Sequence, residues 1–318
     1  MTYAQLRGYL FEIFVSKMLE ENGFKKCEYN NGLNINQSPC ELISQDGEIQ
    51  GRGTNHQIDF VGIYENNIPF VFPIRILGEC KYYKKSVSKD TIRKFIGVIK
   101  DIDENYFYNQ REERIRFLNV PIIFSATSFH NEAANLAWAQ GINIVSYHNI
   151  PILRSYLEEI DDCIIRFYKY RNSIIPKEKS RIIKENFQRT CDIPQFNTFL
   201  FATTDRGLLI NLISEQNFPD ELFSESNEQD CAIYFNENER GDNRVFYLIL
   251  NEDNENRRFY FQVNEALLKK EFSDLSLNER INEKMKYFRK LTIIKKINGI
   301  NRIINLNVNF DSIRGIVR

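Results

Sequence analysis

Apolar and polar positions in the first half of the chain follow two periods, one typical of amphipathic helices and the other of strands. The first helical pattern opens at Thr2 and Gln5, which have capping-box spacing, and Gly23 closes it. Helical patterns cover residues 3–22, 88–102 and 130–140, and strand patterns cover 42–49, 56–64, 70–82, 120–125 and 142–147. The order α, β, β, β, α, β, α, β predicts an α/β domain.

The second half of the chain has a different pattern. An apolar helix is expected over about 150–170, and a linker near 172–179, where Pro176 precedes a charged run. Strand patterns follow over 231–235, 245–251 and 258–263, then a helix near 277–289 and two strands near Leu291 and Ile303. We therefore predict two domains, residues 1–172 and 173–318, the second of α+β type.

Composition limits the class of protein. The 318 residues are 42% hydrophobic, which excludes a disordered or fibrous chain. The 42 Lys and Arg residues nearly balance the 43 Asp and Glu residues, so the whole chain has no net attraction to nucleic acid or membrane. Residues 215–256, however, carry 12 acids and two arginines, whereas 284–318 carry nine basic residues and one acid. The two segments are either complementary faces of one domain, or the second is a basic tail that contacts phosphate.

The cysteines and the apolar runs are typical of a cytoplasmic protein. The six cysteines include no CxxC pair and are accompanied by only three histidines, so neither a zinc ribbon nor a disulfide framework has the required spacing. Reduced thiols are expected. Arg7 and Glu12 interrupt the segment where a secretion signal would be apolar, and Pro73 and Arg75 interrupt the most hydrophobic run, 68–77. We expect neither a secretion signal nor a membrane span.

Two acidic residues and a lysine stand out on two successive predicted strands. Asp59 belongs to the strand before an expected turn at 66–69, and Glu79 and Lys81 close the strand after it. Because side chains alternate along a strand, Glu79 and Lys81 are expected to share one face, and Gln57 and Asp59 to share a face of the neighbouring strand. If these strands pair through the turn, the four side chains converge.

Such a group of side chains has a specific chemistry. Two carboxylates a few ångström apart repel each other unless a divalent cation holds them, and Mg²⁺ prefers oxygen ligands of this kind. A lysine beside them can orient or deprotonate a water that attacks phosphorus. An exposed Glu79–Lys81 ion pair with no function is the simpler alternative. Gln57 either orients a water or a phosphate, or is an ordinary hydrogen-bonding strand residue.

A basic segment follows the candidate site. Residues 81–100 contain seven basic residues and one acid, with Tyr82 and Tyr83 interleaved, a composition typical of phosphate-binding surfaces. The candidates for contact with nucleic acid in this segment are Lys84, Lys85, Lys89 and Arg93. Arg52 lies in a glycine turn at 51–53, which either lets the backbone approach DNA with Arg52 on a phosphate or is only a tight hairpin.

Over about residues 5–150 the sequence resembles the PD-(D/E)xK nuclease superfamily. Within it, the chain is similar to the Mrr-type restriction endonucleases and their relatives, the archaeal Holliday-junction resolvases. The resemblance rests on residues 8–12, 57–59, 79–81 and 124–128, on Ala133 and Ala137, and on residues 141–142. It implies a restriction-endonuclease-like core of order αβββαβ, with a mixed sheet flanked by helices, which agrees with the order of the predicted elements.

The resemblance also implies roles for individual residues. By position, Asp59 and Glu79 would be metal-binding carboxylates, the backbone carbonyl of Cys80 a further ligand, and Lys81 the catalytic lysine. Glu12 matches an additional acid on the first helix that many members use to complete the metal site. Its neighbours at helical spacing are uncharged, so it has no ion pair within the helix, although an isolated solvent-facing glutamate would look the same.

These roles imply a Mg²⁺-dependent endonuclease that hydrolyses DNA phosphodiester bonds, with Mn²⁺ able to substitute. The resemblance further implies a prokaryotic restriction or anti-phage defence role and a homodimer that cuts both strands. The second domain would supply specificity for a DNA sequence or modification, or receive an activator or a partner of the defence system. Two alternatives remain: a non-catalytic nucleic-acid-binding or assembly module that keeps the nuclease fold, and an RNA nuclease with the same site chemistry.

Overall fold

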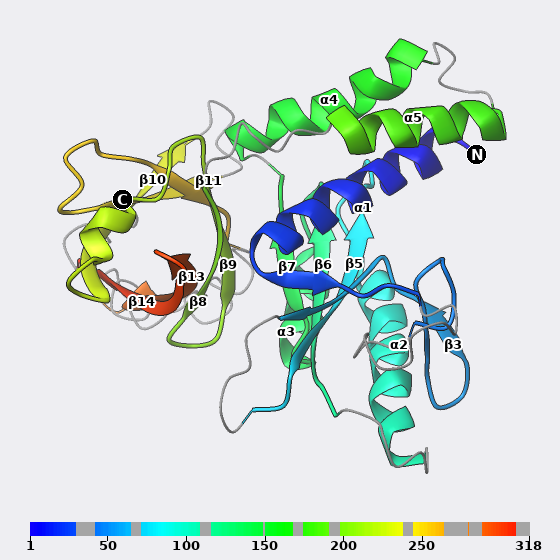
Figure 1. Ribbon diagram of the computed structural model, residues 1–318, viewed down its shortest axis with the longest axis horizontal. Helices are drawn as coiled ribbons and strands as arrows, with labels where there is room; N and C mark the ends of the chain where they lie inside the picture. Colours follow the sequence, from blue (N-terminus) through cyan, green and yellow to red (C-terminus); the bar gives the residue numbers. More distant parts are fainter. Residues whose placement is uncertain are drawn as a thin grey trace. The chain divides into compact units, whose positions relative to one another are not determined.

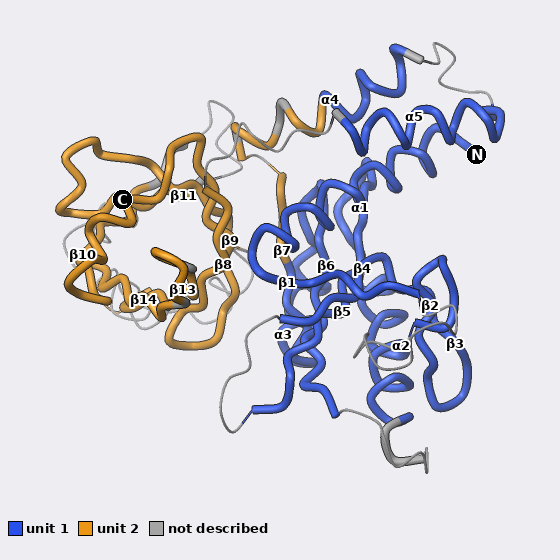
Figure 2. Tube along the Cα trace, in the orientation of Figure 1, with its two compact units in different colours: residues 1–144, 159–191 blue, residues 145–158, 192–318 orange. Residues whose placement is uncertain are grey.

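The computed structural model describes residues 1–29, 42–64, 71–108, 116–148, 150–167, 174–190, 198–237, 244–263, 279 and 288–309. Its helices and strands confirm the predicted α/β class (Figure 1). The chain forms two compact units: unit 1 comprises residues 1–144 and 159–191, and unit 2 comprises residues 145–158 and 192–318 (Figure 2). Within the described part of the chain, no helix has the length and apolar character needed to cross a membrane.

A five-stranded sheet lies at the centre of unit 1, with the strand order β1-β4-β5-β6-β7. The bounds of these strands are Phe24–Lys26, Phe60–Tyr64, Ile74–Lys81, Leu118–Ser125 and Asn143–Ser146. β5 is antiparallel to β4 and parallel to β6, so the sheet is mixed. Three consecutive residues of β5, Ile76, Leu77 and Gly78, are buried, as the apolar run in the sequence predicts for a strand covered on both faces.

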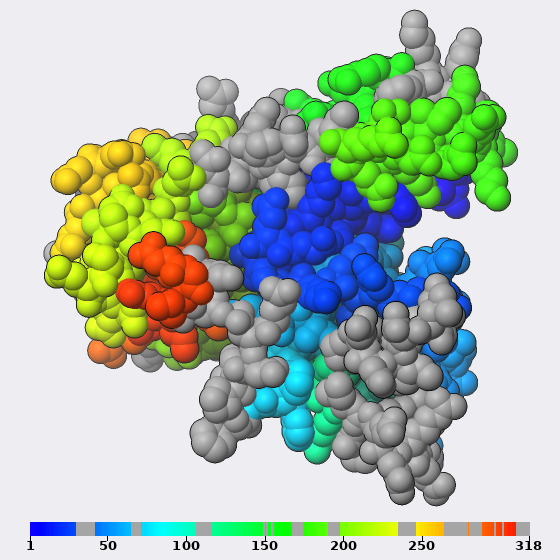
Figure 3. Space-filling model, in the orientation of Figure 1, coloured from blue at the N-terminus to red at the C-terminus, as the bar shows by residue number. Residues whose placement is uncertain are grey.

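The described residues form five α-helices, α1 to α5, with the bounds Tyr3–Glu21, Lys89–Tyr108, Asn131–Ala139, Pro151–Phe167 and Lys177–Thr190. The predicted capping box is present at the start of α1, where Thr2 and Gln5 bond reciprocally. α1 packs against β1 and β5, and α5 packs against α1, as the green and blue surfaces in Figure 3 show. Lys17 of α1 also donates to the Gln188 carbonyl of α5 at 3.0 Å. α1 is therefore fixed from two sides.

The strand predicted over 56–64 is two strands in the structure. β3, Asn55–Gln57, pairs with β2, Glu48–Gln50, in a separate two-stranded sheet, and only β4 joins the main sheet. The strand predicted over 42–49 is reduced to the short β2. β1 was not predicted, because three residues are too few to show a period.

The break between the two strands falls at Asp59. The prediction that Gln57 and Asp59 share one face of one strand was therefore wrong, since Gln57 ends β3 and Phe60 begins β4. The alternation of apolar and polar residues could not reveal the break. Ile58 and Phe60, on its two sides, are both apolar and buried, so the alternation continues without interruption. The turn expected at 66–69 lies outside the described residues.

The glycine turn between β2 and β3 is fastened to α2. Asp101 of α2 accepts the backbone N–H groups of Gly53 at 2.9 Å and Thr54 at 3.3 Å, and it lies 2.7 Å from Nε2 of His56. A Cβ at Gly51 would approach the Asp101 carboxylate and lie 2.8 Å from the Thr54 carbonyl oxygen. The glycine is thus explained by a tight hairpin against α2, which favours the simpler of the two interpretations of this turn.

A closed seven-stranded barrel forms most of unit 2, in the order β10-β11-β12-β9-β8-β13-β14. In chain order, β8 to β14 have the bounds Thr198–Thr204, Leu209–Ser214, Glu228–Glu237, Arg244–Leu250, Phe259–Phe261, Lys290–Ile297 and Ile300–Val308. Inward-facing side chains such as Leu212, Leu248, Phe259, Phe261 and Leu291 are fully buried and form one core. A short 3₁₀-helix, η1, covers Asp220–Phe223.

The prediction of an α+β second domain did not include a closed barrel. The strands expected near 231–235, 245–251 and 258–263 exist, but β8 and β9 were not predicted. The ring closes through the parallel pairing of β10 with β14, where Cys231 lies opposite Val308. Pairing between strands so distant in the chain leaves no local pattern in the sequence. The helix predicted near 277–289 lies mostly outside the described residues.

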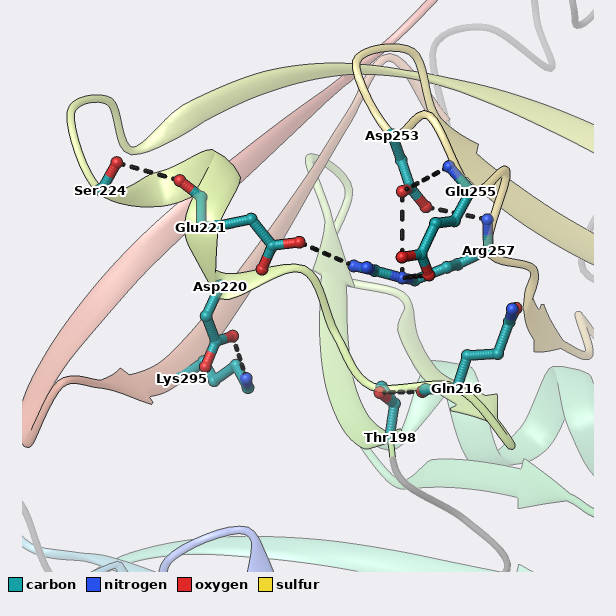
Figure 4. A network of polar contacts seen from close by, with 9 residues as sticks. All are labelled: Thr198, Gln216, Asp220, Glu221, Ser224, Asp253, Glu255, Arg257 and Lys295. Atoms are coloured by element: carbon teal, nitrogen blue, oxygen red, sulfur yellow. Dashed lines mark hydrogen bonds and ion pairs between the residues drawn. The ribbon is translucent and has the colours of Figure 1, made fainter.

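The segregated charges of the second half meet inside unit 2. Lys295 of β13 donates to the carboxylate of Asp220 in η1 (Figure 4), and Lys290 lies 3.7 Å from Glu228. These pairs join the acidic segment 215–256 to the basic segment that begins at 284. They support complementary faces of one domain over a separate basic tail.

Two further expectations differ from the structure. The linker expected at 172–179 contains the start of α5, which belongs to unit 1, so the change of unit follows this helix. Cys80, Cys163 and Cys231 are free, as expected, but Cys27 is disulfide-bonded. Disulfide formation depends on the separation and direction of the Cα–Cβ vectors, which spacing along the chain does not give.

Candidate active site

Asp59 is held at the edge of the main sheet where β4 begins. The pairing of β4 with β5 ends at Phe60 and Gly78. Beyond that point the backbone N–H of Cys80 donates to Oδ2 of Asp59 at 2.7 Å, so the carboxylate takes the place that a strand partner would otherwise fill. The break between β3 and β4 therefore positions the side chain of Asp59, which the sequence indicated as a candidate site residue.

Glu79 and Lys81 lie together on β5. They are two residues apart, so their side chains project from the same face, and Nζ of Lys81 donates to Oε1 of Glu79. The two side chains are only 20% and 19% exposed, respectively. The predicted pairing on one face is thus present, but this ion pair is mostly removed from solvent and is not the exposed pair of the simpler alternative.

Glu12 reaches the same region from α1. Burial, and after it the charges of Asp59 and Glu79, raise the pKa of Glu12 to about 8, while Lys81 and Lys184 oppose the shift. A Coulombic effect of this kind requires proximity in a region of low dielectric constant. A helix, a strand break and a strand thus each supply a carboxyl group, and the charges of Asp59 and Glu79 act on Glu12.

The same surroundings shift the pKa values of the other ionisable groups of the site. Burial raises the pKa of both Asp59 and Glu79, because the charged form of a carboxyl is disfavoured in a poorly solvated position. Burial alone would lower the pKa of Lys81, but the charges of Glu79 and Asp59 outweigh it and raise the value. Lys81 is therefore a cation at neutral pH, able to donate hydrogen bonds but not to remove a proton.

Lys184 of α5 is a member of the site that the sequence did not indicate. Its Nζ lies 3.4 Å from the centroid of the Tyr9 ring, a cation–π contact across the α1–α5 interface. Burial lowers the pKa of Lys184, and the charges of Glu12 and Asp46 oppose this. Burial and the charges of Glu12 and Asp46 also raise the pKa of Tyr9. A second lysine thus acts on Glu12.

The donor atoms suit a hard divalent cation in chemistry. Carboxylate oxygens of Asp59 and Glu79 and a strand carbonyl at Cys80 are the ligand types that Mg²⁺ prefers, and Mg²⁺ commonly binds one or two carboxylates and keeps several waters. Among the residues that the structure describes, no group of three or more His, Cys, Asp or Glu side chains is placed to hold a metal ion. By their chemistry, the carboxylates of Asp59 and Glu79 and the Cys80 carbonyl could hold such an ion, and Glu12 acts on them through its charge.

The residues predicted to contact nucleic acid are spread over the surface of unit 1. Lys84 and Lys85 follow β5 and are exposed. Lys89 pairs with Glu132 at 2.7 Å, and Arg93 pairs with its helix neighbour Asp90 at 2.9 Å. Exposed ion pairs of this kind contribute at most about 1 kcal/mol, so a phosphate can compete for both cations.

Arg52 and Gln57 lie on the β2–β3 hairpin. The guanidinium of Arg52 pairs with Glu104 of α2 at 2.7 Å, and its backbone N–H donates to the Asp101 carbonyl. Gln57 is exposed and lies opposite Glu48 in the register of β2 and β3. Arg52 therefore has a structural role in the hairpin, whereas Gln57 ends β3 and is not on the strand that follows Asp59.

Comparison with known proteins adds no family. No family model matches the chain, and no curated protein matches it. One solved structure that matches is described as "Crystal Structure of Protein of Unknown Function AF1548". It is 18% identical, covers 57% of this chain and 96% of its own, and has a TM-score of 0.32. A similarity at this level says nothing of function.

Proposed function

We propose that the chain is a metal-dependent endonuclease that hydrolyses DNA phosphodiester bonds, of the PD-(D/E)xK type and similar to Mrr-type restriction endonucleases. One observation carries the proposal. Glu12, Asp59 and Glu79 interact with Lys81 in a poorly solvated region, where burial first and then repulsion from Asp59 raise the pKa of both glutamates. Carboxylates held together at such an energetic cost are typical of a site that binds a cation for function.

The residues support a hydrolytic mechanism. Asp59, Glu79 and the Cys80 carbonyl would hold Mg²⁺, or Mn²⁺ in its place. Such an ion, when bound, stabilises the charge that develops on the phosphate and makes a bound water more acidic. Lys81, a cation beside Glu79, orients the attacking water and donates to the oxygens that gain charge. Burial of these side chains strengthens each of these interactions.

The proposal is tested with the purified full chain and plasmid DNA. We expect nicking or cutting of supercoiled DNA with Mg²⁺ or Mn²⁺, and none with EDTA. A second measurement does not depend on activity: at a Mg²⁺ concentration 100 times its Kd, binding would stabilise the fold by about 2.7 kcal/mol, seen as a higher melting temperature. This gain should be absent in Asp59→Asn. A chain that neither cuts DNA nor gains stability from Mg²⁺ would contradict the proposal.

Lys184 provides a second prediction within this function. Its positive charge is held by the Tyr9 ring next to Glu12, so it is placed to attract the phosphate backbone. We expect Lys184→Gln to raise KM for DNA about 10-fold with a smaller effect on kcat, as loss of one phosphate contact of roughly 1.4 kcal/mol would do. Lys179→Gln, on the same helix, is the matched control. An unchanged KM for Lys184→Gln would assign the lysine a purely structural role.

A non-catalytic nucleic-acid-binding or assembly module with the nuclease fold is the second candidate. One observation favours it, because no three acidic side chains among the described residues are arranged around a common point that could hold a metal ion. The Mg²⁺ melting measurement separates the two candidates, since such a module would have no stabilising response to the ion. An RNA nuclease would respond to Mg²⁺ as a DNA nuclease does and is separated from it by the choice of substrate.

The resemblance also supports a biological setting for the proposed activity. Mrr-type enzymes belong to prokaryotic restriction, so we place the chain in the cytoplasm, in restriction or anti-phage defence, as a homodimer that cuts both strands of DNA. Unit 2 would then recognise DNA or receive an activator or a partner of the defence system. Each of these statements rests on analogy.

A further inference from the structure

Three tyrosines form a continuous row across the barrel of unit 2. Tyr234 of β10 lies directly opposite Tyr247 of β11, and Tyr247 lies opposite Tyr260 of β12. The ring centroids of Tyr234 and Tyr247 are 5.4 Å apart with an interplanar angle of 21°, and those of Tyr247 and Tyr260 are 5.8 Å apart at 51°. The three rings therefore line up from strand to strand, one per strand.

This row lies on the outside of the barrel. The residues that alternate with the tyrosines, Ile233, Leu248 and Phe259, are at most 2% exposed and belong to the barrel core. Side chains alternate along a strand, so the tyrosines point the other way. Tyr234, at one end of the row, is 43% exposed. An aromatic ring that is open to solvent beside two others offers a face for further stacking.

Arg258 completes the row with a positive charge. Its guanidinium carbon lies 5.1 Å from the centroid of the Tyr247 ring. In the part of the chain that the structure describes, no acidic side chain lies within ion-pair distance of Arg258. Its backbone N–H donates to Oε1 of Gln216 at 3.3 Å, which fixes the segment that carries it. The cation is thus placed over the aromatic row and is not neutralised there.

The neighbouring Arg257, unlike Arg258, forms ion pairs with acidic side chains. Its guanidinium bonds to Glu221 at 3.0 Å and to Glu255 at 2.8 Å, while Asp253 accepts its backbone N–H at 2.8 Å (Figure 4). Three acids of the strongly acidic segment are therefore occupied by Arg257 and the loop around it. This network ties the loop before β12 to η1, and the next residue, Arg258, contacts Tyr247.

The surroundings of the row carry little negative charge. Ala232 and Ile249, on the same outer face of β10 and β11, and Gln262 after β12 are uncharged. The exposed Asp230 lies four residues from Tyr234 along β10, about 13 Å away at the usual rise of a strand. Among the described side chains of these strands, no carboxylate therefore lies next to the tyrosines on the outer face.

We propose that Tyr234, Tyr247, Tyr260 and Arg258 form a surface on which the bases of single-stranded nucleic acid stack. Cross-strand aromatic pairs stabilise a sheet by only about 0.2–1 kcal/mol, and a structural role needs neither an open ring nor an unpaired arginine. A row of rings with an arginine is the combination that binds unpaired bases, at about 1–3 kcal/mol for each stacked base and with little dependence on sequence. The surface lies in unit 2 and does not depend on the proposed nuclease activity.

The test uses the full chain in EDTA, so that no cleavage interferes. Fluorescence anisotropy would measure binding of labelled oligothymidylate and oligouridylate of about 15 nucleotides, with a DNA duplex for comparison. We expect the single strands to bind more tightly than the duplex. Tyr234→Ala should weaken single-strand binding about 10-fold, whereas Tyr234→Phe, which keeps the ring, should stay within about 2-fold of wild type. Tyr234→Phe should keep the wild-type melting temperature, and Tyr234→Ala should lower it by only a few degrees, because a cross-strand aromatic pair contributes about 0.2–1 kcal/mol.

Salt dependence separates the two parts of the surface. Arg258→Gln should lower the slope of log affinity against log salt concentration by about 0.7, the value for one phosphate contact on a single strand, and Tyr234→Ala should leave the slope unchanged. The proposal is overturned if Tyr234→Ala binds single strands as wild type does, or if wild type does not bind them. It is equally overturned if Tyr234→Ala alters only the oligomeric state, which would assign the row to contact between copies of the chain.

Discussion

Lys81→Ala is expected to reduce metal-dependent DNA cleavage by about 1,000-fold, within the usual range for a group that acts on proton transfer or on developing charge. The structure gives the reason. Nζ of Lys81 is held on Glu79, and the raised pKa of Lys81 keeps it a cation. Alanine removes the charged donor beside Glu79, so the attacking water loses its orientation. Cleavage of supercoiled plasmid under single-turnover conditions measures the effect.

Two controls make this result specific. Lys26→Ala removes an exposed lysine of β1 in the same unit and should cut DNA at the wild-type rate. Asp59→Asn keeps an oxygen that can accept the Cys80 N–H but loses the charge that holds a cation, so it should be as inactive as Lys81→Ala. Burial raises the pKa of Asp59, so its melting temperature in EDTA should be no lower than that of wild type. If wild type cuts DNA and both site variants cut it equally well, the chemistry resides elsewhere in the chain.

The sequence predicted the parts of this site that lie on one strand. Glu79 and Lys81 are two residues apart, and period-two alternation is enough to put them on one face. Asp59 was singled out for a reason that the structure does not support. It lies at a break between β3 and β4, where its carboxylate accepts the Cys80 N–H, and not on the face of a regular strand.

Contacts between distant elements could not be predicted in this way. The position of Glu12 near the strand carboxylates was implied only by the resemblance to a nuclease family, since helical periodicity does not say which strand a helix covers. Lys184 had no signal at all, because its contact with Tyr9 depends on the packing of α5 on α1. The closed barrel of unit 2 could not be predicted for the same reason, because the pairing that closes it joins β10 with β14, which is distant in the chain.

Glu12→Gln is expected to change stability and activity in opposite directions. Burial and the charges of Asp59 and Glu79 raise the pKa of Glu12 to about 8 in the folded chain, from an ordinary value of 4.5. The folded state therefore binds a proton more tightly than the unfolded state. Stability contributed by this proton is fully present below pH 4.5 and is lost progressively as the pH rises to about 8. Glutamine cannot ionise, so it escapes this loss.

The magnitude follows from the size of the shift. Between pH 4.5 and pH 7 wild type should lose up to about 3 kcal/mol relative to Glu12→Gln, at 1.36 kcal/mol for each pH unit. Urea unfolding in EDTA from pH 5 to pH 8 measures the difference, which should grow with pH. Glu28→Gln, at an exposed position of the same unit, is the control and should show no such growth. A difference that is constant across this range would refute the assigned environment of Glu12.

The same substitution should weaken the proposed function. A site that repels its own carboxylates in EDTA is one that a divalent cation relieves, so the negative charge lost in Glu12→Gln also lowers the attraction for Mg²⁺. We expect the Mg²⁺-induced rise in melting temperature to be smaller in Glu12→Gln than in wild type, with a corresponding fall in the cleavage rate at limiting Mg²⁺. A variant that is more stable in EDTA and gains as much from Mg²⁺ as wild type would show that Glu12 is buried near the site without serving it. The energetic cost of Glu12 and its function would then have separate causes, and only the strand carboxylates would belong to the metal site.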